Sequence, residues 1–213
     1  MKQSERKPSE RYREWLLGLA IVRIILAVVA IPLAPFLYRE HFLILVLLRP
    51  TKEVFLAGGF LARQGDVNLL QILIAAVPLS ILGVWNFYGL GKGYAKEIDS
   101  DDLPPLADRI ITPKRIKKFD KALDRKGPRL IFLGRMAAMS SATIAAAAGA
   151  TKMPAREFLP ADGLGGAASF ALATGAGYLL GAAHEEAGPW LTGLAAVALI
   201  GFAFVLGRQL QRA

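Results

Sequence analysis

The sequence predicts an all-α integral membrane protein. Of its 213 residues 54% are hydrophobic and only 20% are charged, whereas soluble domains average nearer 25% charged residues. The mean hydropathy is +0.41, and the apolar residues lie in long runs separated by clusters of charge, as in transmembrane helices. This pattern excludes a disordered chain, a coiled coil and a water-soluble enzyme. The chain has no cysteine, which excludes disulfides and a thiolate nucleophile.

Four segments are long enough to cross a bilayer, because a hydrocarbon core of roughly 30 Å takes about 20 helical residues. The predicted transmembrane helices are 15–38, 67–90, 158–183 and 189–207. Arg23 and Asp162 are the charged residues inside them. We expect Arg23 to snorkel or to be paired, and Asp162 to lie near the cytoplasmic entrance of its helix, where a carboxylate suits the helix dipole.

Two further apolar segments are expected to enter the membrane and return on the same side. Residues 41–62 are two short apolar stretches separated by the polar run from Arg49 to Glu53. Residues 130–151 carry Arg135 and the pair Ser140 and Ser141 in their middle. Each segment is predicted to be a re-entrant helical hairpin, with its tip at these polar residues.

The basic residues predict the orientation of the chain. Eleven of the 26 lysines and arginines lie in the connector at 91–129, and five lie in the tail at 1–14. Both segments are therefore expected on the cytoplasmic side, so the chain crosses the membrane an even number of times between them. The first hairpin then enters from outside and the second from inside, with both termini cytoplasmic and residues 1–213 forming a single membrane domain.

An internal repeat supports this arrangement. At an offset of 90 residues Gly59 aligns with Gly149 and Tyr88 with Tyr178. Two hairpin-plus-helix units entering from opposite sides form an inverted repeat, which is common in secondary transporters. Broken helices at membrane depth are tolerated where they pack in protein or line a wet cavity, so we expect a cavity between the two tips.

The connector is predicted to contain one cytoplasmic amphipathic helix. It begins with Thr112 as its N-cap and Pro113 in its first turn, and it ends at Gly127 and Pro128. The apolar residues Ile116, Phe119 and Leu123 share one face of this helix. Basic residues surround that face, so the helix can lie on an anionic leaflet.

Several motifs, in order and spacing, resemble the DedA family, also called the SNARE-associated Golgi or VTT-domain superfamily. The second hairpin carries the motifs Arg125-Lys126-Gly127, Phe132-Leu133-Gly134-Arg135, Ala148-Gly149, Met153-Pro154, Phe158 and Gly177-Tyr178-Leu179-Leu180-Gly181. Residues 50–65 resemble the first hairpin of that family. In the family an acidic residue follows Pro-Gly at the first tip, whereas this chain has Lys52 and Glu53 there. The family's aspartate in the helix after the first hairpin is also absent, near Gly83.

The resemblance implies a membrane transporter that moves lipids, such as a phospholipid or the undecaprenyl phosphate carrier, and a link to proton-dependent membrane homeostasis. A proton- or ion-coupled small-solute transporter fits the same skeleton, and a non-catalytic scaffold is a further alternative. An enzyme is not expected, because the sequence has no Gly-x-Ser-x-Gly, His-Glu-x-x-His or aspartate-rich motif. No cofactor and no metal are expected.

Arg135 is the first candidate site residue. A guanidinium at membrane depth persists when it is paired or faces a cavity. It is expected either to clamp a phosphate, for which its planar fork of donors is suited, or to form a structural ion pair with Glu53. Lys52 and Arg49 at the first tip either attract an anionic headgroup or snorkel.

The remaining candidates are carboxylates and hydroxyls. Glu53 and Glu40 are candidate proton carriers or counter-charges for Arg135, and Glu40 is equally an interfacial residue. Ser140 and Ser141 at the second tip either donate to phosphate oxygens or bond back to helix carbonyls.

The expected partners are membrane lipids with anionic headgroups, in a prokaryotic plasma membrane. The net charge of +9 is explained by the orientation of the loops, so nucleic acid is not an expected partner. The glycine- and alanine-rich helix at 163–183 would permit close packing within the chain or in a homo-oligomer.

Overall fold

The computed structural model describes residues 8–100, 102–111, 113, 116, 117, 119, 122, 123, 127–137, 139–187, 197 and 200. Its secondary structure in this part of the chain is entirely helical, which confirms the predicted all-α class. The helices are α1 (Pro8–Glu40), α2 (Phe42–Leu48), α3 (Lys52–Gln64), α4 (Leu69–Gly93), α5 (Ala95–Ser100), α6 (Pro105–Ile111), α8 (Pro128–Met136), α9 (Ser141–Ala150) and α10 (Ala155–Ala187).

Three helices are long and apolar enough to cross a membrane: Glu10–Glu40, Leu69–Gly93 and Ala155–Ala183. Large apolar side chains such as Val22, Ile25 and Val28 of α1 are about half exposed, so the outer surface suits lipid rather than water. The chain is therefore an integral membrane protein. Apart from residues 197 and 200, the fourth predicted span at 189–207 lies outside the described residues.

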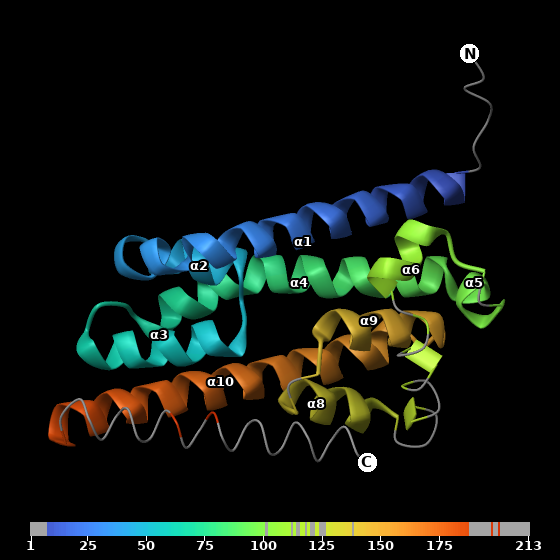
Figure 1. Cartoon of the computed structure of the whole chain (residues 1–213). Coiled ribbons are helices and arrows are strands. Elements are labelled where there is room, and N and C mark those ends of the chain that lie inside the picture. The colour runs from blue at the N-terminus through green and yellow to red at the C-terminus, as the bar shows by residue number, and fades with distance from the viewer. Residues whose placement is uncertain are drawn as a thin grey trace.

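Two helical hairpins fill the space between the long helices (Figure 1). The hairpin of α2 and α3 lies at one end of α4, and the hairpin of α8 and α9 lies towards the other end, with their connecting loops facing the middle. Their arms have 7 to 13 residues, or roughly 10–20 Å, which is shorter than a bilayer core. Their re-entrant placement in a membrane stays a prediction.

Each hairpin packs against the long helix of the other unit, and glycines make the contact close. Where α3 crosses α10, a Cβ on Gly59 would lie 1.9 Å from the carbonyl oxygen of Thr174. A Cβ on Gly177 would lie 1.9 Å from the carbonyl oxygen of Leu56. Both helices therefore need glycine at this crossing, as small residues do in tightly packed membrane helices.

The crossing of α4 and α9 repeats this arrangement. A Cβ on Gly91 would lie 1.9 Å from the oxygen of Ala146, and one on Gly149 would lie 2.1 Å from that of Tyr88. The hairpin glycines of the two crossings, Gly59 and Gly149, are 90 residues apart, as the sequence repeat predicts. In the structure, the counterpart of Gly91 is Gly177. The sequence repeat instead aligns Gly91 with Gly181, which lies one helical turn after Gly177.

The connector covers one end of the bundle. The apolar face predicted for its helix is confirmed, since Ile116, Phe119 and Leu123 are all buried. They pack into the protein core with residues of α4 and α9, so the expectation that this face lies on a lipid leaflet is wrong. The protein core outcompetes the leaflet because α4, α5 and α9 already present an apolar surface there. The predicted N-cap, Thr112, lies outside the described residues.

Two buried clusters occupy opposite ends of α4 and leave its middle free. Ile72 and Ala76 belong to the cluster formed with α2 and α3, and residues from Val84 to Leu90 belong to the cluster formed with α9 and the connector. Residues 77, 80 and 81 lie between the clusters and face a cavity.

Candidate functional site

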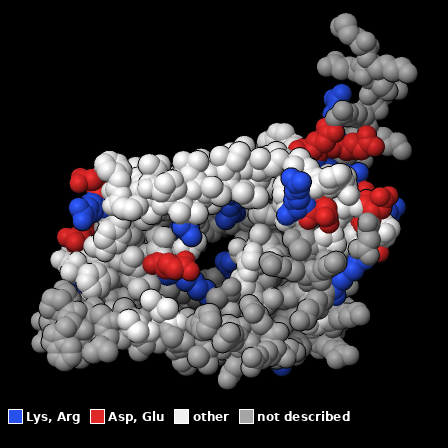
Figure 2. Space-filling view, viewed as in Figure 1, with Lys and Arg blue, Asp and Glu red and all other residues white. Residues whose placement is uncertain are grey.

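A cavity of about 780 Å³ lies between the two hairpin loops, as the sequence predicts. This central cavity is bordered by residues 49–53 and 55 of the first hairpin, by residues 135, 139 and 141 of the second, by the middle of α1 and α4, and by residues between 159 and 170 in the N-terminal half of α10. Figure 2 shows a hollow in the middle of one face, with basic atoms on several sides of it and acidic atoms beside it. Its volume is in the range of ordinary ligand sites.

The first loop places several charged groups at the cavity. α2 ends at Leu48 and α3 begins at Lys52 with Thr51 as its N-cap residue, so the short connection holds Arg49 and Pro50 at the tip. Arg49, Lys52 and Glu53 all line the cavity. Lys52 also reaches the opposite hairpin, where its Nζ donates a 2.7 Å hydrogen bond to the carbonyl oxygen of Met136. The two hairpin tips are therefore in direct contact.

Arg135 enters the cavity from the second hairpin, in the last turn of α8. Its side chain lies along α10 at two glycines. A Cβ on Gly165 would lie 2.9 Å from the Arg135 Cβ, and one on Gly166 would lie 3.0 Å from its Nη2. The pair of glycines thus forms a groove that carries the guanidinium into the cavity.

The partner of Arg135 is Asp162 of α10. Nε of Arg135 lies 3.2 Å from Oδ1 of Asp162, whose side chain is only 8% exposed. The structural ion pair considered for Arg135 thus forms with Asp162 rather than with Glu53. The expectation that Asp162 sits at the entrance of its helix is wrong, because α10 begins at Ala155 and places Asp162 two turns inside it.

Arg23 is a cavity residue that the sequence analysis did not assign to the site. It projects from the middle of α1 across Gly83 of α4, where a Cβ would lie 0.6 Å from its Nη1. Nη1 is buried and has no hydrogen-bond partner in the described part of the chain. A charged residue inside an otherwise apolar span was the only sequence signal for it.

Five of the seven predicted site residues line the cavity, from both hairpins: Arg49, Lys52, Glu53, Arg135 and Ser141. The structure does not bring the other two there. Ser140 is exposed and caps α9, accepting a 3.5 Å hydrogen bond from the backbone N–H of Thr143. Glu40 is exposed at the end of α1 and is not among the described residues that border the cavity.

The lining of the cavity combines charged side chains with apolar ones. Its described lining has four basic side chains and two acidic ones, which leaves a net charge of +2: Arg23, Arg49, Lys52, Arg135, Glu53 and Asp162. The remainder is mainly apolar, with Leu73, Val77, Ile81, Trp85, Leu159 and Phe170. The arrangement can hold a molecule that combines an anionic group with an apolar chain.

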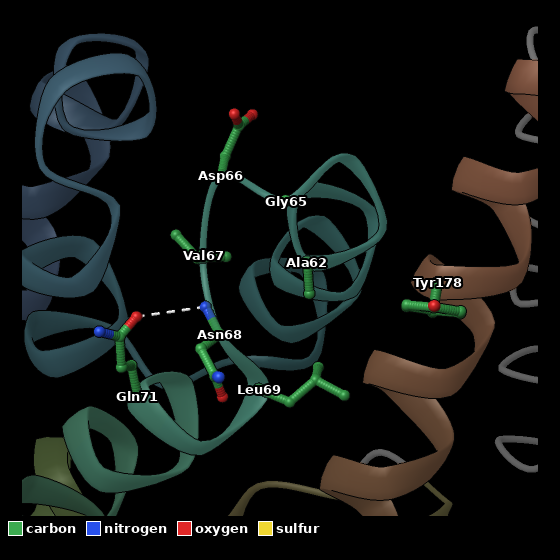
Figure 3. Close-up of a pocket in the computed structure, with 8 residues that line it drawn as sticks. All are labelled: Ala62, Gly65, Asp66, Val67, Asn68, Leu69, Gln71 and Tyr178. Atoms are coloured by element: carbon green, nitrogen blue, oxygen red, sulfur yellow. Dashed lines mark hydrogen bonds between the residues drawn. The ribbon is translucent and has the colours of Figure 1, made fainter.

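A second cavity, of about 490 Å³, lies at the turn between α3 and α4. Figure 3 shows Tyr178 of α10 on one side of it and residues 65–69 on the other, where the backbone N–H of Asn68 donates to Oε1 of Gln71. Asp66 is the one charged residue in its described lining. Because its described lining includes no cation, the second cavity is a weaker candidate for an anionic ligand.

Comparison with known proteins supports the membrane assignment. The VTT domain family matches residues 50–179, a range that contains α3 of the first hairpin, the whole second hairpin and most of the lining of the central cavity. A protein of Synechocystis sp. named as an uncharacterized membrane protein is 29% identical over 168 residues, covering 73% of this chain and 74% of its own. An alkaline phosphatase-like protein of Lactococcus lactis subsp. cremoris is 25% identical over 162 residues, covering 74% of this chain and 76% of its own. No solved structure matches the chain.

Proposed function

Because the chain belongs to the VTT-domain family of the DedA superfamily, we propose that it is a transporter that moves an anionic lipid across the bilayer. The observation that supports this proposal is the central cavity, whose lining combines basic side chains with large apolar ones. A lipid headgroup such as a phosphate is anionic and its acyl or prenyl chain is apolar, so each part has a matching surface.

Arg135 is the main headgroup ligand in this proposal, with Lys52 and Arg49 beside it. Guanidinium groups bind phosphate oxygens through a planar fork of donors, and ammonium groups bind them as point charges. Ser141 is a further donor on the second hairpin. Asp162 holds Arg135 at Nε, which leaves the outer nitrogens of the guanidinium for a ligand.

Proton coupling is the finer part of the proposal, and Glu53 is its carrier. Glu53 is exposed and borders the same cavity as the cations, so a proton bound there alters the charge that a headgroup meets. Glu40 stays a second candidate, at the exposed end of α1.

We further propose that the protein acts by transport rather than catalysis, with lipids as partners, in a prokaryotic plasma membrane with both termini on the cytoplasmic side. The basic connector sets this orientation and needs no nucleic-acid partner. Close glycine-rich helix surfaces would permit a homo-oligomer.

The test is a flip assay with purified protein in liposomes that hold a fluorescent phospholipid or polyprenyl phosphate. Chemical bleaching of the outer leaflet should reach the protected inner lipid only when the protein is present. Arg135→Ala should abolish this movement while the protein still accumulates in the membrane, and Arg39→Gln, at the exposed end of α1, is the matched control. Glu53→Gln should remove the response to a pH gradient.

If no anionic lipid moves, with or without a pH gradient, lipid transport is wrong. Currents or pH changes that depend on a small solute would then favour the solute transporter. Absence of both activities would favour a scaffold. If Arg135→Ala only lowers the amount of protein, Arg135 acts structurally.

A further inference from the structure

Arg23 is held in place by the small size of one residue on the facing helix. Its guanidinium lies where the side chain of any residue larger than glycine at position 83 would be, since a Cβ there would come within 0.6 Å of Nη1. Gly83 is buried in the described structure. The notch at Gly83 therefore lets the Arg23 side chain cross α4 and reach the central cavity.

Snorkelling to the membrane surface does not explain this position. Arg23 lies eight residues inside the predicted span at 15–38, so the nearer end of that span is about 12 Å away at 1.5 Å per residue. An arginine side chain is shorter than that. The guanidinium is directed inward, to the cavity, and not outward to an interface.

A structural ion pair does not explain it either. In the described residues no carboxylate forms an ion pair with Arg23, and its buried Nη1 has no hydrogen-bond partner. The positive charge of Arg135 acts on both Arg23 and Lys52, and its effect on each is repulsive. Asp162 offsets only part of this charge. An unpaired buried charge is costly, so an anion bound among Arg23, Lys52 and Arg135 would stabilise these three cations.

We propose that Arg23 and Arg135 together form a two-arginine anion site that binds the phosphate group of the transported molecule. The identity of the ligand as a lipid rests on the proposed function, whereas the position of the site rests on where the structure places the two arginines. Arg135 approaches from the second hairpin and Arg23 from α1, so a phosphate between them receives donors from two sides. Arg23 precedes the region 50–179 that matches the family, so the N-terminal helix of this chain completes the site.

Trp85 provides a direct measurement of binding, since it borders the same cavity. The chain has three tryptophans, and replacing Trp15 and Trp190 by phenylalanine leaves Trp85 as the reporter. The purified reporter protein in detergent is titrated with dihexanoyl phosphatidylglycerol, with dihexanoyl phosphatidylcholine and with inorganic phosphate. Phosphatidylglycerol should change Trp85 fluorescence at lower concentration than the zwitterionic lipid. If inorganic phosphate binds as tightly as phosphatidylglycerol, this result would also support the site and would identify free phosphate as its ligand.

The test variants remove or displace the Arg23 guanidinium. Arg23→Gln should weaken phosphatidylglycerol binding about tenfold to a hundredfold, as expected for a lost charged hydrogen bond. Gly83→Ala leaves Arg23 present but occupies its path, so it should weaken binding comparably. Two controls should bind as the reporter protein does: Arg39→Gln, at the exposed end of α1, and Gly175→Ala, whose added Cβ would meet nothing within 4 Å. Thermal melting checks that each variant is folded. If Arg23→Gln does not fold, the affinity of Gly83→Ala tests the role of Arg23 in binding.

The two-arginine site would be overturned if Arg23→Gln, or folded Gly83→Ala, bound phosphatidylglycerol with the same affinity as the reporter protein. This holds whatever the flip assay shows. Binding that depends on Arg23 without any flipping in liposomes would overturn lipid transport and leave the anion site supported. A reporter protein that binds neither phosphatidylglycerol nor phosphate would overturn the inference as well.

Discussion

Arg135 on α8 and Asp162 on α10 form an ion pair in the lining of the central cavity, with Nε and Oδ1 3.2 Å apart. The pair joins the tip of the second hairpin to a long helix, and it lies on a groove formed by Gly165 and Gly166. It holds the arginine by one nitrogen only. The same contact thus fixes the hairpin and presents the rest of the guanidinium to the cavity.

Asp162→Ala should destabilise the protein, because it leaves the Arg135 charge poorly compensated. Breaking one side of a buried pair costs about 3 kcal/mol, whereas removing both sides is often close to neutral. The double variant Arg135→Ala with Asp162→Ala should therefore recover most of the lost stability. Thermal unfolding in detergent compares the natural protein, Asp162→Ala, Arg135→Ala and the double variant. Additive losses in the double variant would show that the pair is not coupled.

Lys52→Met should loosen the contact between the hairpin tips, because it removes the Nζ hydrogen bond to the Met136 carbonyl. Hydrogen bonds to charged groups contribute about 1.5–3 kcal/mol, so local opening should become roughly tenfold more frequent. Hydrogen exchange of the backbone at 133–139 measures it. Lys96→Met, at an exposed position on α5, is the matched control and should leave exchange in that segment unchanged.

The hairpin side of the site was predictable from sequence, and the long-helix side was not. Arg135, Lys52 and Arg49 interrupt short apolar stretches, so their position at hairpin tips follows from the pattern of hydropathy. Asp162 was misplaced because its role depends on where α10 begins, and helix starts are poorly marked inside an apolar run.

Arg23 and the connector show a different limit. A charge in an apolar span is visible in the sequence, but its direction depends on the residue that faces it, and Gly83 carries no pattern of its own. In the connector the apolar face of Ile116 and Phe119 was predictable from helical spacing. The surface that covers it was not, because a lipid leaflet and a protein core demand the same residues.

Gly59→Ala should destabilise the crossing of α3 and α10, because its Cβ would lie 1.9 Å from the carbonyl oxygen of Thr174. Overpacking of this kind costs about 1–3 kcal/mol. Gly149→Ala at the crossing of α4 and α9 should cost a similar amount. Gly175→Ala meets nothing within 4 Å and should be neutral or stabilise by about 0.5–1 kcal/mol. Unfolding midpoints in detergent compare the three, and equal midpoints would contradict the close crossings.

The contact between Arg13 and Glu97 should make stability depend on acid pH. Burial of the Glu97 carboxyl raises its pKa, but the hydrogen bond and charge of Arg13, a backbone hydrogen bond and the charge of Lys96 together outweigh burial, so the net pKa is below its usual value. Its contribution is therefore present above the unfolded pKa of about 4.3 and is lost as pH falls through the lower folded pKa. Arg13→Gln should lower the unfolding temperature at pH 7, and its difference from the natural protein should narrow as the pH falls to about 3, leaving the part that comes from the Arg13 contacts with Gly93 and Tyr94. A constant difference across this range would contradict the coupling.

The absence of cysteine allows the predicted membrane orientation to be tested with single introduced thiols. Gln64→Cys lies at the exposed end of α3, and Lys96→Cys lies on the exposed side of α5, and α4 runs between them. With the connector in the cytoplasm, a membrane-impermeant maleimide added to intact cells should label Gln64→Cys at once. It should label Lys96→Cys only after permeabilisation, because α4 crosses the bilayer between the two positions. Labelling of both from outside would show that α4 does not span, and the reverse order would show that the basic connector faces outward.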